Sequence, residues 1–154
     1  MAVLVSNTQK KVKVQVGSLR KAASSALEYM GYPNAELSIL VTGDRKMRVL
    51  NRQYRGMDKT TDVLSFPALE DKVALRDASG VEGGPPVALG DIVISAPRAL
   101  AQAGEIGQSL GDELSFLLVH GILHLVGYDH ERSPSDKRRM EKKQKEIVGF
   151  LRRN

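Results

Sequence analysis

The feature that most constrains the fold of this chain is an apolar stretch that carries two histidines four residues apart. Leu114 to Val126 contains only three polar side chains, so this stretch is predicted to form a helix that is buried on nearly all sides. Two of those polar residues, His120 and His124, lie one above the other on such a helix. Because burying two imidazoles without partners is costly, the pattern favours a metal ion that satisfies both.

A third histidine follows this helix. Gly127 can adopt the left-handed conformation that ends a helix, and the chain can then turn back to bring His130 toward the same point. The sequence has no further histidine and no cysteine, so the ligands of a metal here are nitrogen and oxygen atoms. Three protein ligands leave one position of a tetrahedral zinc ion open, as in catalytic sites, whereas structural sites use four.

We therefore predict that His120, His124 and His130 hold one Zn²⁺ ion. Three imidazoles would also bind another divalent transition metal such as Ni²⁺. The metal that is bound then depends on availability as much as on affinity. The alternative is three ordinary histidines, two in a core and one in a loop. This spacing of the three histidines seldom arises by chance, which disfavours that alternative.

The length and composition fit one globular domain. A chain of 154 residues can bury about two thirds of its unfolded surface, and 42% hydrophobic with 27% charged residues is an ordinary globular composition. There are too few apolar residues before Lys10 for a signal peptide, and no apolar run approaches the length of a membrane span. We expect a single domain over residues 1–154 that is cytoplasmic and has no membrane partner.

The net charge of +5 is concentrated at the C-terminal end. Residues 133–154 contain eight Lys or Arg and three Asp or Glu, whereas the charges of residues 1–132 sum to zero. A basic C-terminal helix suits a polyanion such as RNA, although a solvated helix face is the simpler alternative. The candidate RNA-binding residues are Lys137, Arg138, Lys142 and Lys145.

Hydrophobic periodicity predicts a mixed domain of strands and about five helices. The expected strands comprise residues 2–6, 36–42, 62–68 and 89–95. The expected helices comprise residues 18–30, a segment from residue 44, a segment from residue 96, the histidine helix and residues 133–154. Strands alternate with helices early in the chain and helices dominate later, which favours one mixed sheet of about four strands with helices packed on it.

Local signals predict how some of these elements begin and end. Ser18 and Ser95 should cap helices, and Gly107 and Gly111 should separate the helix after Ser95 from the histidine helix. The first strand should be buried and followed by an exposed extension at residues 12–16. Residues 70–86, rich in charge, glycine and proline, should form a loop.

The histidine spacing is also that of the metzincin proteases, His-Glu-x-x-His-x-x-Gly-x-x-His. This chain has Gly121 where those enzymes have the glutamate that acts as general base. Peptide hydrolysis depends on that carboxylate to move a proton to a poor leaving group, so the protease interpretation is disfavoured. Phosphodiester hydrolysis needs instead a metal and positive charge near the phosphate, for which arginine is well suited.

Three stretches of the chain resemble motifs of the YbeY family, bacterial single-strand-specific endoribonucleases that act in ribosomal RNA maturation. They are residues 50–67, which include Tyr54-Arg55, residues 89–95 and residues 120–130. The chain departs from the family pattern at Thr60-Thr61-Asp62, where Pro-Thr-Asp is common.

This resemblance implies an α+β fold with a mixed four-stranded sheet and a metalloprotease-like zinc site formed by the three histidines. It also implies hydrolysis of phosphodiesters in single-stranded RNA, with Arg55 as the functional arginine that faces the metal and stabilises the anionic transition state. The expected role is 16S rRNA 3′-end maturation and ribosome quality control, with the ribosome or ribosome-assembly factors as partners. The sequence does not predict an oligomeric state.

Three aspartates are candidates for orienting a ligand histidine or a water molecule: Asp62, Asp91 and Asp129. Asp62 and Asp91 are each also expected at the start of a strand, where a capping role is at least as good an explanation, and Asp129 is equally ambiguous. Ser65 has no free histidine to act as its base, so we expect it to line the floor of the cleft.

Two other functions stay open at this stage. One is a metal hydrolase that acts on a peptide or another small substrate. The other is a non-catalytic RNA-binding ribosome-assembly factor, in which a fourth protein ligand closes a structural metal site.

Overall fold

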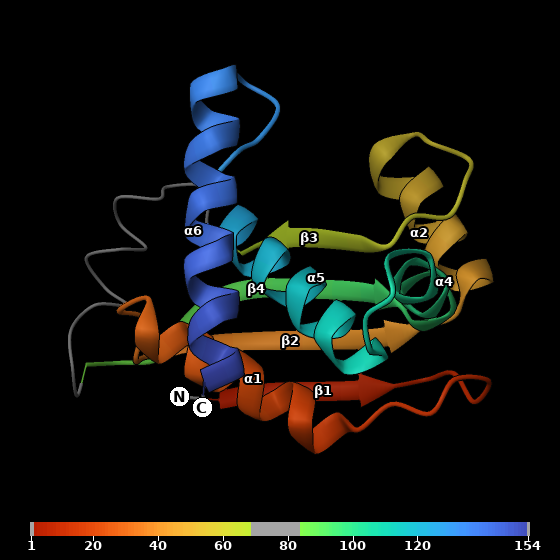
Figure 1. Ribbon diagram of the computed structural model, residues 1–154, viewed down its shortest axis with the longest axis horizontal. Helices are drawn as coiled ribbons and strands as arrows, with labels where there is room; N and C mark the ends of the chain where they lie inside the picture. The colour runs from red at the N-terminus through yellow and green to blue at the C-terminus, as the bar shows by residue number, and fades with distance from the viewer. Residues whose placement is uncertain (1, 69–83, 154) are drawn as a thin grey trace.

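The computed structural model describes residues 2–68 and 84–153 (Figure 1). The strands in these ranges are β1 (Ala2–Asn7), β2 (Ala35–Thr42), β3 (Val63–Pro67) and β4 (Val87–Ser95). The helices are α1 (Val16–Tyr29), α2 (Asp44–Arg55), α4 (Ala96–Ile106), α5 (Leu110–Leu125) and α6 (Pro134–Arg153). None of these helices is long and apolar enough to cross a membrane.

The four strands form one mixed sheet in the order β1-β2-β4-β3. β1 pairs with β2 and β2 with β4 in parallel, whereas β3 pairs with β4 in the antiparallel direction. The predicted α+β fold with a mixed four-stranded sheet is therefore confirmed. The sheet order places β3, which follows α2 in the chain, at the edge of the sheet.

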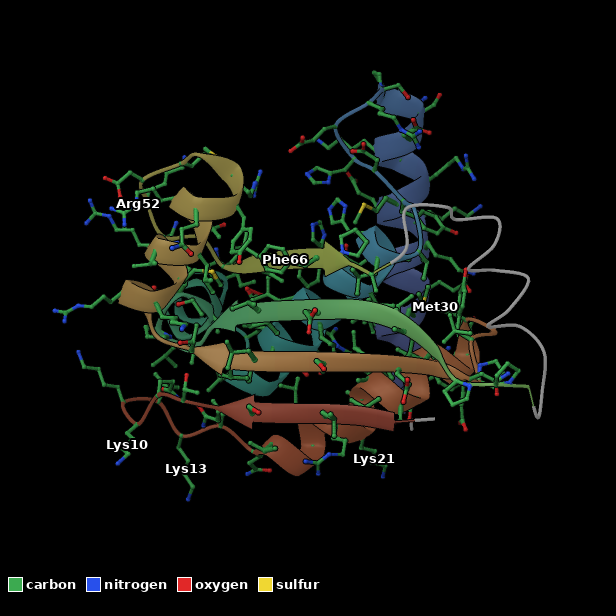
Figure 2. All side chains as sticks on the ribbon, turned by 180° about the vertical axis from the view of Figure 1, so that it is seen from behind. Lys10, Lys13, Lys21, Met30, Arg52 and Phe66 are labelled. Carbon is green, nitrogen blue, oxygen red and sulfur yellow. The ribbon has the colours of Figure 1, made fainter. Side chains whose placement is uncertain are left out.

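The helices are distributed unequally over the two faces of the sheet. Figure 1 shows α1, α5 and α6 crossing one face, and Figure 2, seen from behind, shows the strands of the other face largely uncovered, with α2 at one end. The main core lies between the sheet and α5, where Ile92, Leu118 and Ile122 are fully buried. A smaller core of Met47, Leu64 and Val93 holds α2 on the opposite face.

Helix α5 is buried along most of its length, as its apolar sequence predicts. Phe116 is its one exposed large hydrophobic side chain, with 42% of its surface exposed. Ser109 caps the helix by accepting a hydrogen bond from the amide of Asp112, and the buried residues continue to Leu125. This burial fixes the position of the side chains that α5 presents at its C-terminal end.

Several predicted boundaries differ from the structure. The strand β1 lies at a sheet edge and leaves Leu4 66% exposed, so the prediction that it is buried is wrong. Helix α1 begins at Val16, and the hydroxyl of Ser18, expected as the cap, bonds instead to the Gln15 side chain. Gly111 lies inside the first turn of α5, where it does not separate two helices.

Other signals were predicted correctly. Ser95 caps α4 by accepting a hydrogen bond from the amide of Arg98, and Gly107 ends that helix with a positive φ of 71°. The exposed extension expected at residues 12–16 was wrong: Val12 and Val14 form no strand and pack, partly buried, against the main core, and Val16 begins α1. Most of the predicted loop at residues 70–86 lies outside the described residues.

Candidate metal centre

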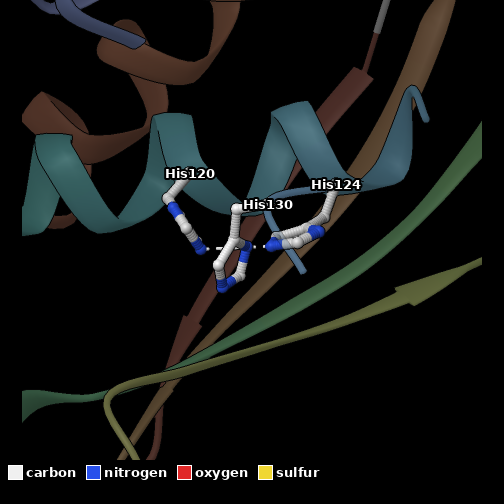
Figure 3. Close-up of side chains that lie close together, drawn as sticks. All are labelled: His120, His124 and His130. Carbon is white, nitrogen blue, oxygen red and sulfur yellow. Dashed lines mark hydrogen bonds between the residues drawn. The ribbon is translucent and has the colours of Figure 1, made fainter. Parts of the chain in front are cut away.

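Helix α5 and the turn that follows it bring the three histidines together (Figure 3). His120 and His124 lie one turn apart on α5, and their Nε2 atoms are 3.1 Å from each other. One nitrogen from each of the three rings lies within 4.8 Å of the others. The cluster that the spacing predicts therefore forms from residues that are all partly buried.

The turn after α5 is a Schellman motif, a standard way to end a helix. The amide of Tyr128 donates to the carbonyl oxygen of Leu123, and the amide of Gly127 donates to that of His124. Gly127 has a φ of 107°, a conformation that favours glycine. Asp129 then accepts a hydrogen bond from the amide of Glu131, which closes the turn that carries His130.

Burial disfavours the charged form of the two imidazoles on α5. Burial, together with the neighbouring His120 and His130, lowers the pKa of His124 to about 4. Burial also lowers the pKa of His120, although its hydrogen bond with Gln144 opposes the shift. Neutral imidazole is the form that binds metal ions.

The donor set fits a metal ion. Two nitrogens on a tetrahedral zinc ion lie roughly 3.3 Å apart, given Zn–N distances of about 2.0–2.1 Å, and the His120 and His124 nitrogens are 3.1 Å apart. The Nδ1 atom of His130 is buried and has no hydrogen-bond partner among the described residues. An unpartnered buried nitrogen is costly, and a cation shared by the three rings would satisfy it.

Helix α6 places a residue behind this cluster that no sequence signal indicated. Gln144 is only 5% exposed, and its Oε1 lies 3.2 Å from Nδ1 of His120. Its Nε2 donates to the backbone carbonyl of Phe116 at 3.0 Å, which fixes the orientation of the amide. Oε1 must then accept from Nδ1–H of His120, so the Nε2 lone pair of His120 is free to face the cluster.

The histidines line a cleft of about 840 Å³ that runs between α5 and β3. Other lining residues are Arg55, Asp62, Ser65 and Asp129. Arg55 is the last residue of α2 and is exposed. Within the described ranges it forms no ion pair, so its guanidinium is available to an anion in the cleft. The structure thus brings Arg55 to the same cleft as the histidines, although 65 positions separate it from His120.

Asp62 has the capping role that was considered for it. Its Oδ1 accepts a hydrogen bond from the amide of Val63 at 2.8 Å, which starts β3, and its Oδ2 accepts one from Gln102 of α4. It also lines the cleft, and its negative charge acts to raise the pKa of His120. Its carboxylate is therefore anchored and electrostatically coupled to the histidine cluster.

Asp91 lies away from the histidine cluster, so the prediction that it could orient a ligand histidine is wrong. It sits in the middle of β4 and pairs with Phe66, so its side chain shares the face of the sheet that carries α2. The next residue, Ile92, faces α5. Because successive strand residues point to opposite faces, Asp91 is directed away from the histidines, and it lines a separate hollow on the α2 face.

Gly121 permits the close approach of α5 to the sheet. A Cβ atom at this position would lie 2.9 Å from Cδ1 of Ile92 and 3.1 Å from Oγ of Ser65. Ser65 lines the cleft, as expected, and donates a hydrogen bond to the carbonyl oxygen of Gly121. A side chain at this position would displace its neighbours, and the glutamate general base of the metzincins has no counterpart at Gly121.

The four basic residues predicted to bind RNA are exposed on α6. None of Lys137, Arg138, Lys142 and Lys145 is among the described residues that line the cleft. Lys137 lies 4.0 Å from Glu141 on its own helix. The face of α6 that reaches the site is the buried one, through Gln144.

These observations define a single-domain α+β protein with a three-histidine cluster, able to hold a metal ion, in a cleft that also carries Arg55, which has no ion pair among the described residues. A family model described as Endoribonuclease YbeY matches residues 4–152. The chain therefore belongs to the YbeY endoribonuclease family, as its motifs indicate.

Individual relatives agree with this assignment. An Endoribonuclease YbeY of Geobacter metallireducens is 42% identical over 154 residues, which covers 99% of this chain and 97% of the relative. One of Roseiflexus sp. is 50% identical over 116 residues, 75% of this chain and 70% of the relative. A solution structure of a Thermotoga maritima protein superposes with a TM-score of 0.66 at 26% identity, covering 97% of this chain and 88% of the other.

Proposed function

We propose that this protein is a zinc-dependent endoribonuclease that hydrolyses phosphodiesters of single-stranded RNA. One observation carries the proposal: a chain of the YbeY family gathers three histidines in one cleft with Arg55, which forms no ion pair among the described residues. His120, His124 and His130 would hold the zinc ion. When bound, the ion supplies Lewis acidity that polarises a phosphoryl oxygen and acidifies water.

Other residues of the chain bind the phosphate or position the histidines. The exposed guanidinium of Arg55 binds the phosphate and stabilises the negative charge that develops on it during hydrolysis. Gln144 keeps His120 in the tautomer that leaves Nε2 free. Asp62, fixed by Val63 and Gln102, adds negative charge near His120, and Asp129 holds the turn that carries His130.

The family suggests the biological substrate. We propose ribosomal RNA, with maturation of the 16S 3′ end and ribosome quality control as the cytoplasmic role, and the ribosome or its assembly factors as partners. The basic face of α6, with Lys137, Arg138, Lys142 and Lys145, would attract the RNA backbone from outside the cleft. Affinity for RNA should then fall steeply with salt concentration.

Metal analysis and cleavage of single-stranded RNA test the proposal together. His124→Ala should lose both metal and cleavage, because it removes one of three ligands. Arg55→Ala should keep its metal and cleave at least a hundredfold more slowly. Arg98→Ala, a matched exposed arginine on α4 outside the cleft lining, should behave as wild type. Full metal content and full cleavage in His124→Ala would contradict the proposal.

A further inference from the structure

We propose that Tyr54 is a stacking platform for one nucleobase of the RNA in the cleft, an inference that rests on the function proposed above. Tyr54 lies in the last turn of α2, directly before Arg55, and lines the same cleft as the histidines. It is 65% exposed. Among the described residues, no other large hydrophobic side chain is both exposed and part of the cleft lining.

Among the described residues, the ring of Tyr54 has one aromatic contact. It makes an edge contact with Phe66 of β3, with ring centroids 5.1 Å apart and an interplanar angle of 67°. Phe66 in turn packs against the small core of Met47, Leu64 and Val93. An aromatic ring anchored this way is already oriented, so stacking a base on it costs little additional side-chain conformational entropy.

The helix that carries Tyr54 is strongly basic. α2 contains five Arg or Lys residues and one Asp, and all five cations are exposed. Arg48 is engaged by Asp58 at 2.9 Å, whereas Arg55 lies in the cleft and Arg52 extends from α2 in Figure 2. Cationic side chains beside an exposed aromatic ring are the combination that binds single-stranded nucleic acid, through its phosphates and its bases.

Tyr54 and Phe66 also stand where the cleft meets a second hollow. This hollow has a volume of about 550 Å³ and lies on the α2 face of the sheet, where Leu4, Ser38 and Lys46 contribute to its lining. Because both aromatic residues line both spaces, RNA that passes from Arg55 over Tyr54 would lead from the cleft to this second hollow. Bases of a duplex are paired and stacked on each other, so only a single strand offers a base to Tyr54.

The test measures binding of a nuclease-resistant, 2′-O-methyl single-stranded oligonucleotide to the zinc-loaded full-length protein by fluorescence anisotropy. Tyr54→Leu keeps an apolar contact with Phe66 but has no ring, and it should weaken binding roughly tenfold or more. Tyr54→Phe should bind as wild type does. The matched control is Tyr29→Leu, which removes a 40% exposed tyrosine that stacks on Phe150 outside the cleft lining, and its affinity should be unchanged.

Abasic substitutions distinguish stacking from a general change of the surface. Removing one particular base should weaken binding to the wild type and have no further effect on Tyr54→Leu, and duplex RNA should bind both proteins equally. The proposal is overturned if the losses from Tyr54→Leu and from each abasic position simply add, or if Tyr54→Leu binds single strands normally.

Cleavage by the wild type is measured in parallel to separate this inference from the proposed function. If the wild type cleaves single-stranded RNA but Tyr54→Leu binds it as tightly as the wild type does, only the stacking role is overturned. A wild type that neither binds nor cleaves single-stranded RNA overturns both proposals.

Discussion

Removing the side-chain amide of Gln144 should weaken metal binding without unfolding the protein. Gln144→Leu is nearly isosteric and deletes the acceptor for Nδ1–H of His120, which lies 3.2 Å away. The surroundings of this side chain are largely closed to solvent, since Gln144 is 5% exposed. Water therefore replaces the lost partner poorly, and an unsatisfied buried donor costs about 1–3 kcal/mol.

This cost sets the expected change in affinity. A loss of about 1.4–2.7 kcal/mol corresponds to a roughly tenfold to hundredfold weaker affinity for zinc, which is also the range typical of residues that support a ligand histidine. The assay is competition for Zn²⁺ against a chromophoric chelator at pH 7.5. Thermal unfolding of the same samples shows whether the variant is folded.

Lys145→Gln is the matched control, because Lys145 is the next residue of α6 and is exposed. It should bind zinc as the wild type does. If folded Gln144→Leu binds zinc within about twofold of the wild type, the role given to Gln144 is refuted, since even one ordinary hydrogen bond is worth about 0.5–1.5 kcal/mol.

Further predictions concern stability and charge. Gly121→Ala should be less stable than Gly104→Ala by about 1–3 kcal/mol in urea unfolding, because its Cβ would lie 2.9 Å from Ile92, whereas Gly104 has no atom within 4 Å of that position; equal stabilities would contradict the packing argument. Burial raises the pKa of Glu113, so the folded state holds that proton to higher pH than the unfolded state does, and stability falls as pH rises from about 4.5 toward the folded pKa. Glu113→Gln should therefore stabilise the protein more at pH 8 than at pH 4.5 in thermal unfolding, and an equal effect at both would be inconsistent with a raised pKa. Arg55→Lys should keep its metal and lose at least tenfold in RNA cleavage rate, since an ammonium lacks the planar fork that matches phosphate; wild-type rates would show that only charge matters.

The sequence was most informative where function depends on local spacing. His120 and His124 are adjacent because a helix repeats every 3.6 residues, and Gly127 predicted the turn that returns His130 to them. The resemblance in the stretch that contains Arg55 added a residue that spacing alone does not connect to the histidines. The four strands were predicted from short stretches that are apolar or that alternate apolar with polar residues, such as Leu37, Ile39 and Val41.

What the sequence could not show depends on tertiary packing. Gln144 occurs in a basic helix with no distinguishing pattern, and only the docking of α6 on α5 places its amide beside His120. Whether Asp91 faces the histidines depends on which face of the sheet α5 covers, and the periodicity of the sequence does not determine that face. The basic character of α2 was hidden because acidic residues elsewhere cancel its charge in the sum over residues 1–132.

The most direct test of the central claim is a zinc titration of the metal-stripped protein, with the initial rate of single-stranded RNA cleavage measured at each step. The account predicts negligible cleavage without metal and a rate that rises linearly to a plateau at one equivalent of Zn²⁺, because one ion is held by three histidines. Cleavage at the full rate by metal-free protein would contradict the account, as would a fully loaded protein that leaves the RNA intact.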